Sequence, residues 1–173
     1  MKQFLACIML LCSSLAFGQT TIHTLPGEQR CCTGSDAEET VYTAMVSHPG
    51  TDSVTWNLSL AGSFQSSENN TIYFTLNIGD ARVFGFVTTW QEFVKPWTLT
   101  ATVRLNNDGE RRILHVSGEF IFDNDKRFPV VYNSVNEYSA DEIPVSVVGK
   151  ILNNTPKTEN DKVVLTQLDI IQQ

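Results

Sequence analysis

Residues 97–122 read WTLTATVRLNNDGERRILHVSGEFIF, and this segment determines the expected fold class. In its first arm, residues 97–105, apolar side chains occupy every second position and mostly polar ones the positions between. Residues 113–122 repeat the alternation. Successive side chains of a strand point to opposite faces, so a period of two residues is typical of a half-buried strand. The segment therefore predicts two amphipathic strands that share one apolar face.

Asp108 and Gly109 stand between the two arms and predict the turn that joins them. An Asp-Gly pair favours the two-residue type I′ turn, because both central residues of that turn need positive φ. With these two residues as the loop, both members of four facing pairs are apolar: Trp97 with Phe120, Leu99 with Gly118, Ala101 with Val116 and Val103 with Leu114. A slip of one residue would mix the two faces. We therefore predict a β-hairpin in this register.

The remaining sequence carries strand signals at regular intervals, separated by turn clusters. With the hairpin arms they number nine: 40–47, 53–60, 71–78, 82–87, 97–105, 113–122, 128–132, 143–152 and 162–171. Many short strands at even spacing predict an all-β fold, here a single antiparallel β-sandwich, with a closed β-barrel as the alternative.

One short helix is expected at residues 90–95, as a plug at the end of the sheets. Thr89 and Glu92 match the capping-box pattern, and Trp90, Phe93 and Trp97 follow at helical spacing. Pro96 would end the run.

The N-terminus has the pattern of a secretory signal peptide. Lys2 precedes an apolar run, residues 4–15, that is too short to span a bilayer, and small residues lead to a cleavage point before Gln19. We predict a signal peptide at residues 1–18, a flexible N-terminal arm at 19–39 and the sandwich domain at 40–173. The mature chain of 173 − 18 = 155 residues should be secreted to the extracellular space, or periplasmic if the source is a bacterium.

The net charge of the chain disfavours two classes of partner. Without Lys2 the chain has 11 basic and 19 acidic residues, a net charge of −8. Nucleic acids and anionic membranes reward clustered Lys and Arg, so neither is expected as a partner. No second apolar run is long enough for an integral membrane segment.

Cys31 and Cys32 are the two cysteines that remain after the leader is removed. In an oxidising compartment they should form disulfides. A bond between neighbours is strained, because adjacent Cα atoms lie about 3.8 Å apart and disulfides prefer more. Bonds to a second chain avoid that strain and would give a disulfide-linked homodimer. A vicinal ring and free thiols remain as alternatives.

No motif for catalysis, a cofactor or a metal ion is present. His23, His48 and His115 do not have metal-ligand spacing, and no nucleophile motif occurs. His115 and Glu119, two positions apart on the polar face of the hairpin, form the one pair that resembles a base and its orienter. An exposed histidine on a sheet is far commoner, so the sequence predicts a non-enzymatic protein without a cofactor or metal.

Three Asn-x-Ser/Thr sequons predict N-glycosylation at Asn57, Asn69 and Asn153 in a eukaryotic host. Asn57 points outward from its expected strand. The other two lie in polar loops.

The aromatic residues Phe84, Phe86, Trp90, Phe93 and Trp97 are the one group that predicts either a binding surface or a plug of the core. The best interpretation of the whole sequence is a secreted, acidic β-sandwich that binds another macromolecule, a protein or a glycan. The alternative is a lipocalin-like carrier of a small apolar ligand.

Overall fold

The computed structural model describes residues 20–32, 37–47, 53–66, 70–90, 93–108, 111–136, 142–152 and 160–173. Within these ranges the chain forms eleven strands and no helix. They are β1 (Thr20–Thr24), β2 (Gln29–Cys31), β3 (Glu39–Ser47), β4 (Val54–Ser66), β5 (Asn70–Ile78), β6 (Ala81–Trp90), β7 (Phe93–Asp108), β8 (Arg111–Phe122), β9 (Lys126–Asn136), β10 (Glu142–Leu152) and β11 (Lys162–Gln172). Nothing among the described residues forms a helix long and apolar enough to cross a membrane.

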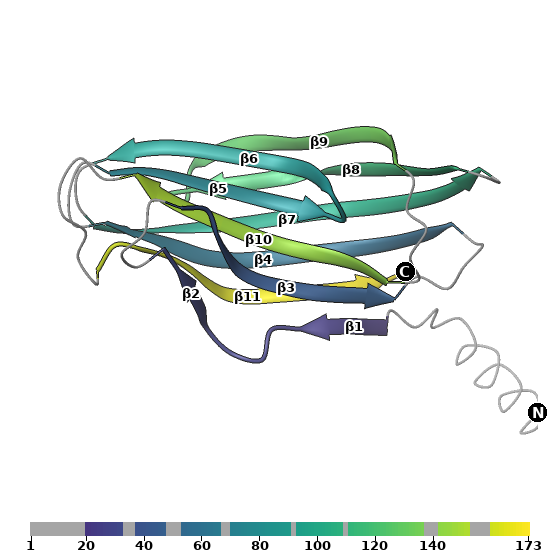
Figure 1. Ribbon diagram of the computed structural model, residues 1–173, viewed down its shortest axis with the longest axis horizontal. Helices are drawn as coiled ribbons and strands as arrows, with labels where there is room; N and C mark the ends of the chain where they lie inside the picture. The colour runs from purple at the N-terminus through teal and green to yellow at the C-terminus, as the bar shows by residue number, and fades with distance from the viewer. Residues whose placement is uncertain are drawn as a thin grey trace, which may run out of the picture.

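The strands form two antiparallel sheets (Figure 1). The larger sheet has the order β1-β11-β4-β7-β8-β9, and β2 also pairs with β11. The smaller sheet has the order β3-β10-β5-β6. Neither sheet closes into a barrel, so the predicted β-sandwich is confirmed and the barrel alternative is wrong.

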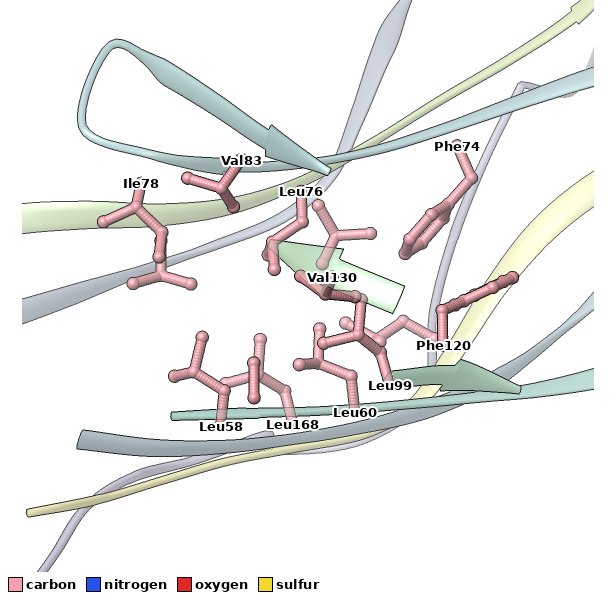
Figure 2. Packing of buried hydrophobic residues seen from close by; sticks show 14 of the residues in the cluster. Leu58, Leu60, Phe74, Leu76, Ile78, Val83, Leu99, Phe120, Val130 and Leu168 are labelled. Carbon is pink, nitrogen blue, oxygen red and sulfur yellow. The ribbon is translucent and has the colours of Figure 1, made fainter. Parts of the chain in front are cut away.

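The core lies between the sheets and is filled by the apolar side of each amphipathic strand. Figure 2 shows Leu76 and Ile78 of the smaller sheet directed toward Leu58, Leu60 and the apolar side chains around them in the larger sheet. Burying one such side chain contributes about 1.5–3 kcal/mol. In β10, buried and less buried residues alternate strictly, as the two-residue apolar period of its sequence predicts.

The central hairpin forms as β7 and β8 with the predicted faces, but its register is shifted by two residues. Trp97 pairs with Phe122 rather than Phe120, and Asp108 pairs with Arg111, so Asp108 belongs to β7 instead of the turn. The other predicted turn residue, Gly109, lies outside the described residues. A shift of two residues leaves every side chain on its original face, so the apolar pattern cannot distinguish the two registers.

The predicted helix at residues 90–95 is wrong. Strand β6 continues to Trp90 and β7 begins at Phe93, with Val94 and Lys95 paired to Gln65 and Phe64 of β4. A helix of one or two turns is marginal by itself, because nucleation fixes several residues for one hydrogen bond. Continuous pairing along β4 stabilises the strand instead.

The expected flexible arm at residues 19–39 is also corrected where the structure describes it. Strands β1 and β2 both pair with β11, and Figure 1 shows them beside it. Ile22 and Leu25 pack against the core. Without these two strands β11 would be an open edge with unpaired backbone groups. Residues 1–18, the expected signal peptide, lie outside the described part of the chain.

Candidate functional site

A shallow hollow of about 300 Å³ lies on the outer face of the larger sheet, over its central strands. Its lining comes from three neighbouring strands: Asn57, Leu58 and Ser59 of β4, Thr100, Ala101 and Thr102 of β7, and Ser117 and Gly118 of β8. Leu58 is buried in the core, so the outward groups of β4 that reach the hollow are its polar neighbours.

The register of the sheet brings these small polar side chains together. Asn57 pairs with Thr102, and Thr102 pairs with Ser117, which forms one row across three strands. Ser59 pairs with Thr100 in the row beside it. Paired positions on one face of a sheet have neighbouring side chains, so the five form a continuous polar surface.

Larger side chains surround this surface, which is why it is concave. On the β11 side Ile171 pairs with Asn57 and Asp169 with Ser59. On the other side Glu119 pairs with Thr100, and Val131 of β9 pairs with Ser117. Small groups at the centre of a ring of large ones leave the hollow between them.

The lining is uncharged and can both donate and accept hydrogen bonds. Thr102 Oγ1 donates to Asn57 Oδ1 at 3.1 Å. The nearby charges have partners of their own: Arg127 donates to Glu119, and Gln167 Nε2 donates to Asp169 Oδ2 at 2.7 Å. The hollow thus presents hydroxyl and amide groups to solvent, with the Glu119–Arg127 ion pair and the hydrogen-bonded carboxylate of Asp169 beside it.

His115 and Glu119 do not form the pair that a general base and its orienter require. His115 Nδ1 lies 2.7 Å from Asn133 Oδ1, in a hydrogen bond, while Glu119 pairs with Arg127. Among the residues that the structure describes, no group of three or more His, Cys, Asp or Glu side chains is placed to hold a metal ion.

The described members of the aromatic group belong to the core. Trp97 is 1% exposed and Phe86 is 8% exposed, and Phe84 packs against the same cluster. The rings of Phe84 and Phe86 lie 5.0 and 4.8 Å from that of Phe120. None of the three lines the hollow. The side chains of Trp90 and Phe93 fall outside the described part of the structure.

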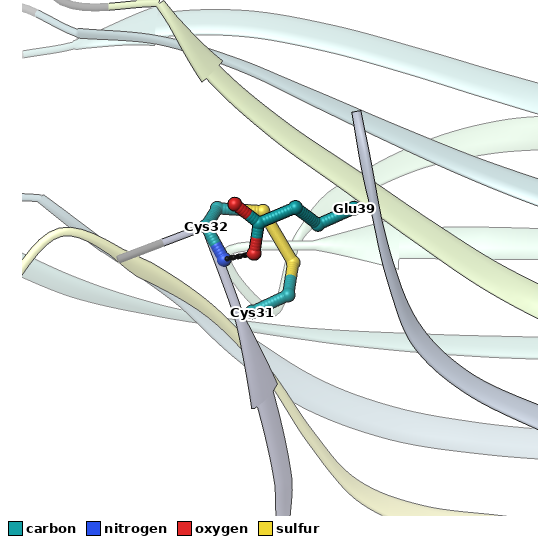
Figure 3. Close-up of a disulfide and its surroundings, with 3 residues drawn as sticks. All are labelled: Cys31, Cys32 and Glu39. Carbon is teal, nitrogen blue, oxygen red and sulfur yellow. Dashed lines mark hydrogen bonds between the residues drawn. A yellow bond between two sulfur atoms is a disulfide. The ribbon is translucent and has the colours of Figure 1, made fainter. Parts of the chain in front are cut away.

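Cys31 and Cys32 bond to one another, and neither is left for a bridge to a second chain (Figure 3). The interchain bridge that the sequence favoured is therefore not the arrangement of this structure. The ring is buried, with Cys31 5% and Cys32 0% exposed. Its Cys32 N–H donates to Glu39 Oε2 of β3 at 2.9 Å, as the dashed line in Figure 3 marks.

Gly149 of β10 provides the space for this ring. A Cβ atom at Gly149 would lie 2.7 Å from Cys31 Sγ and 3.0 Å from Cys32 Sγ. The disulfide therefore packs between β2 of the larger sheet and the strands β3 and β10 of the smaller one, in a place fitted to it.

Of the three sequon asparagines, Asn57 lies in the hollow, half-buried, while Asn69 and Asn153 lie outside the described residues. The hydroxyls of Ser59, Thr100, Thr102 and Ser117 were not singled out by the sequence. Each was expected on an outer face, but their assembly depends on β4 pairing with β7, a long-range contact for which the sequence carries no local signal.

Comparison with known proteins identifies no family. No protein-family model and no curated protein matches the chain. Among solved structures, the chain is similar to the winged bean acidic lectin complexed with methyl-alpha-D-galactose, at 7% identity and a TM-score of 0.39, over 90% of this chain and 99% of that one. At this level of likeness the lectin carries no argument about what the present chain binds.

Proposed function

We propose that this protein is a secreted, non-enzymatic binding module that takes up a glycan on the outer face of its larger sheet. One observation supports the proposal: the concave surface over β4, β7 and β8 is lined by uncharged hydroxyl and amide groups. Such groups exchange hydrogen bonds in both directions, as sugar hydroxyls do.

The surroundings of the hollow fit a neutral ligand with one apolar face. Val131 is 70% exposed and pairs with Ser117 at the edge of the polar row. The C–H face of a pyranose can pack there while its hydroxyls reach Thr100 and Thr102. Because the hollow is shallow and buries few ligand atoms, we expect a dissociation constant on the order of 1 mM for one sugar unit. A longer glycan that reaches further along the sheet would bind more tightly.

The proposal is tested by NMR titration of ¹⁵N-labelled chain produced in bacteria, against a panel of neutral and acidic oligosaccharides. We expect a neutral member of the panel to shift the backbone amides of Thr100, Thr102 and Ser117. The double variant Thr100→Val, Thr102→Val keeps branched side chains on the strand and removes both hydroxyls, so binding should weaken about tenfold or more.

Thr98→Val is the matched control, since Thr98 lies on the same strand and face but outside the hollow. It should leave the affinity unchanged. Shifts confined to another surface, or no shift with any sugar at millimolar concentration, would reject the glycan and leave a protein partner as the next one to examine.

A further inference from the structure

We propose that Asn57 accepts an N-linked glycan and that this glycan covers the hollow, so that glycosylation closes the site to sugars from outside. The claim that this glycan regulates ligand binding rests on the proposed function. Asn57-Leu58-Ser59 is a sequon, and the alternation of β4 directs its first and third residues to the outer face and Leu58 into the core. Both outward residues line the hollow.

The contact between Asn57 and Thr102 is compatible with a sugar on Asn57. Asn57 Oδ1 accepts the hydrogen bond from Thr102 Oγ1 at 3.1 Å. An N-linked sugar is attached to the other amide atom, Nδ2, and the amide keeps its carbonyl oxygen. The Thr102 contact therefore persists after modification and holds the first sugar at the rim of the hollow.

The transfer is balanced with one co-reactant, a polyprenyl-diphosphate-linked oligosaccharide in the secretory compartment. A bond forms between Asn57 Nδ2 and C1 of the first sugar, and the bond between that C1 and the diphosphate oxygen breaks. Nδ2 loses one proton, the polyprenyl diphosphate leaves, and no group is oxidised or reduced.

The position of the sequon makes the two states exclude each other. A glycan on a loop would leave the outer face of the sheet open, but a sugar on Asn57 starts within the lining of the hollow itself. The first sugar of the N-linked glycan and a separate glycan ligand therefore compete for the same space beside Thr100, Thr102 and Ser117. Occupancy at one asparagine then decides whether the hollow is accessible.

Occupancy is measured by peptide mass spectrometry on the full chain secreted from a eukaryotic cell. We expect a glycan on the peptide that contains residues 57–59, and its loss in the Ser59→Ala variant, which removes the acceptor pattern and keeps Asn57. An unmodified Asn57 would overturn the inference, whether or not Asn69 and Asn153 carry glycans.

Closure of the hollow is measured without any ligand, by maleimide labelling of a thiol placed in it. In the Thr100→Cys variant, the secreted glycoform should react at least about tenfold more slowly than the bacterial form, because a bulky glycan shields the site. Enzymatic deglycosylation should restore the rate. The Thr98→Cys control, on the same strand and face, should react equally in both forms.

Equal rates for Thr100→Cys with and without the glycan would overturn the closure. This readout does not depend on sugar binding, so it remains informative if the titration of the bacterial chain fails. Conversely, a hollow that binds sugars in the bacterial chain can still prove unmodified at Asn57.

Discussion

Strand β7 approaches Gly118 so closely that no side chain fits at this position. A Cβ atom there would lie 2.0 Å from the carbonyl oxygen of Thr100 and 2.6 Å from the Cα of Ala101, and backbone atoms cannot move aside alone. We predict that Gly118→Ala lowers the free energy of unfolding by at least about 2 kcal/mol, as overpacking does. The measurement is the urea unfolding midpoint.

Gly85→Ala is the control for this prediction. The three atoms nearest to its Cβ would all belong to the side chain of Arg82, the first at 3.0 Å, and that flexible side chain can move. The expected change is within about 0.5 kcal/mol. If both substitutions destabilise equally, the close approach at Gly118 is not the cause.

Asn70 links the two sheets by hydrogen bonds in a buried place. Its Nδ2 donates to Ser66 Oγ at 2.9 Å and to Asp161 Oδ1 at 3.0 Å, and all three residues are buried. Asn70→Ala removes the donor to a buried carboxylate and should cost about 2–3 kcal/mol in urea unfolding. Asn77→Ala, on the outer face of the same strand, is the control and should cost less than about 1 kcal/mol.

Asn70→Asp keeps the size of this side chain and tests the same contact through pH. Two carboxylates at about 3 Å repel, so one of them would have a raised pKa. A raised folded-state pKa makes the variant's deficit largest at neutral pH and smaller as the pH falls. A deficit that does not change with pH would contradict this account of the contact.

The residue scale also shows why the hollow could not be read from the sequence. The alternation in β7 places Thr100 and Thr102 on the polar face, and this was predictable. That Asn57 and Ser59 lie beside them is a consequence of β4 pairing with β7 across about forty residues of chain. Each strand was amphipathic in the same way, so the strand order had no signature in any one of them.

At the scale of elements, β2 is the strand whose attachment depends on chemistry other than pairing. It spans only Gln29–Cys31 and ends in the buried disulfide ring. A disulfide that closes so short a loop restricts the unfolded chain little, by about 1 kcal/mol in the chain-entropy model. Its effect should therefore be local rather than global.

We predict that chemical reduction loosens β2 and leaves the rest of the sandwich folded. Two separate thiols need more room than the ring, and the fit at Gly149 leaves none. Hydrogen exchange should rise at residues 29–31 and at those of their partners Val163, Val164 and Leu165 whose amides face β2 rather than β4. Strand β1, which also pairs with β11, should stay protected. A Cys31→Ala, Cys32→Ala variant removes both sulfur atoms and with them the crowding, so its exchange at residues 29–31 should stay slower than in the reduced chain. Unchanged exchange after verified reduction would contradict the prediction.

Local sequence patterns predicted which face of a strand is buried, but not how the strands pair. The faces of β7 and β8 followed from their alternation, but the register did not, because a two-residue shift preserves those faces. In the predicted register Gly118 would have faced Leu99; in the structure it faces small Ala101, whose backbone approaches it closely. The helical spacing around Trp90 was likewise outweighed by pairing along β4, a tertiary contact.

At the scale of the whole molecule, the larger sheet is organised around its last strand. Strand β11 pairs with β4 along most of its length and with β1 and β2, which come from the opposite end of the sequence. Contacts this distant in sequence close long loops before any stabilisation is gained, so refolding should be slow for a chain of this size. The sandwich is complete only when both ends of the chain are in place.

A chain truncated after residue 160 therefore should not fold. It would lose five buried apolar side chains, Val163, Val164, Leu165, Leu168 and Ile170. At about 1.5–3 kcal/mol each, that loss is comparable to the 5–15 kcal/mol by which a domain of this kind is typically stable. Deleting residues 20–24 instead removes β1, none of whose side chains is buried, and should leave cooperative urea unfolding with a modestly lower midpoint.

Adding a peptide of residues 160–173 to the truncated chain should restore the near-ultraviolet circular dichroism, because the peptide can pair with β4 as an added strand. Cooperative unfolding of the truncated chain alone would show that β11 is not the strand on which the sheet depends.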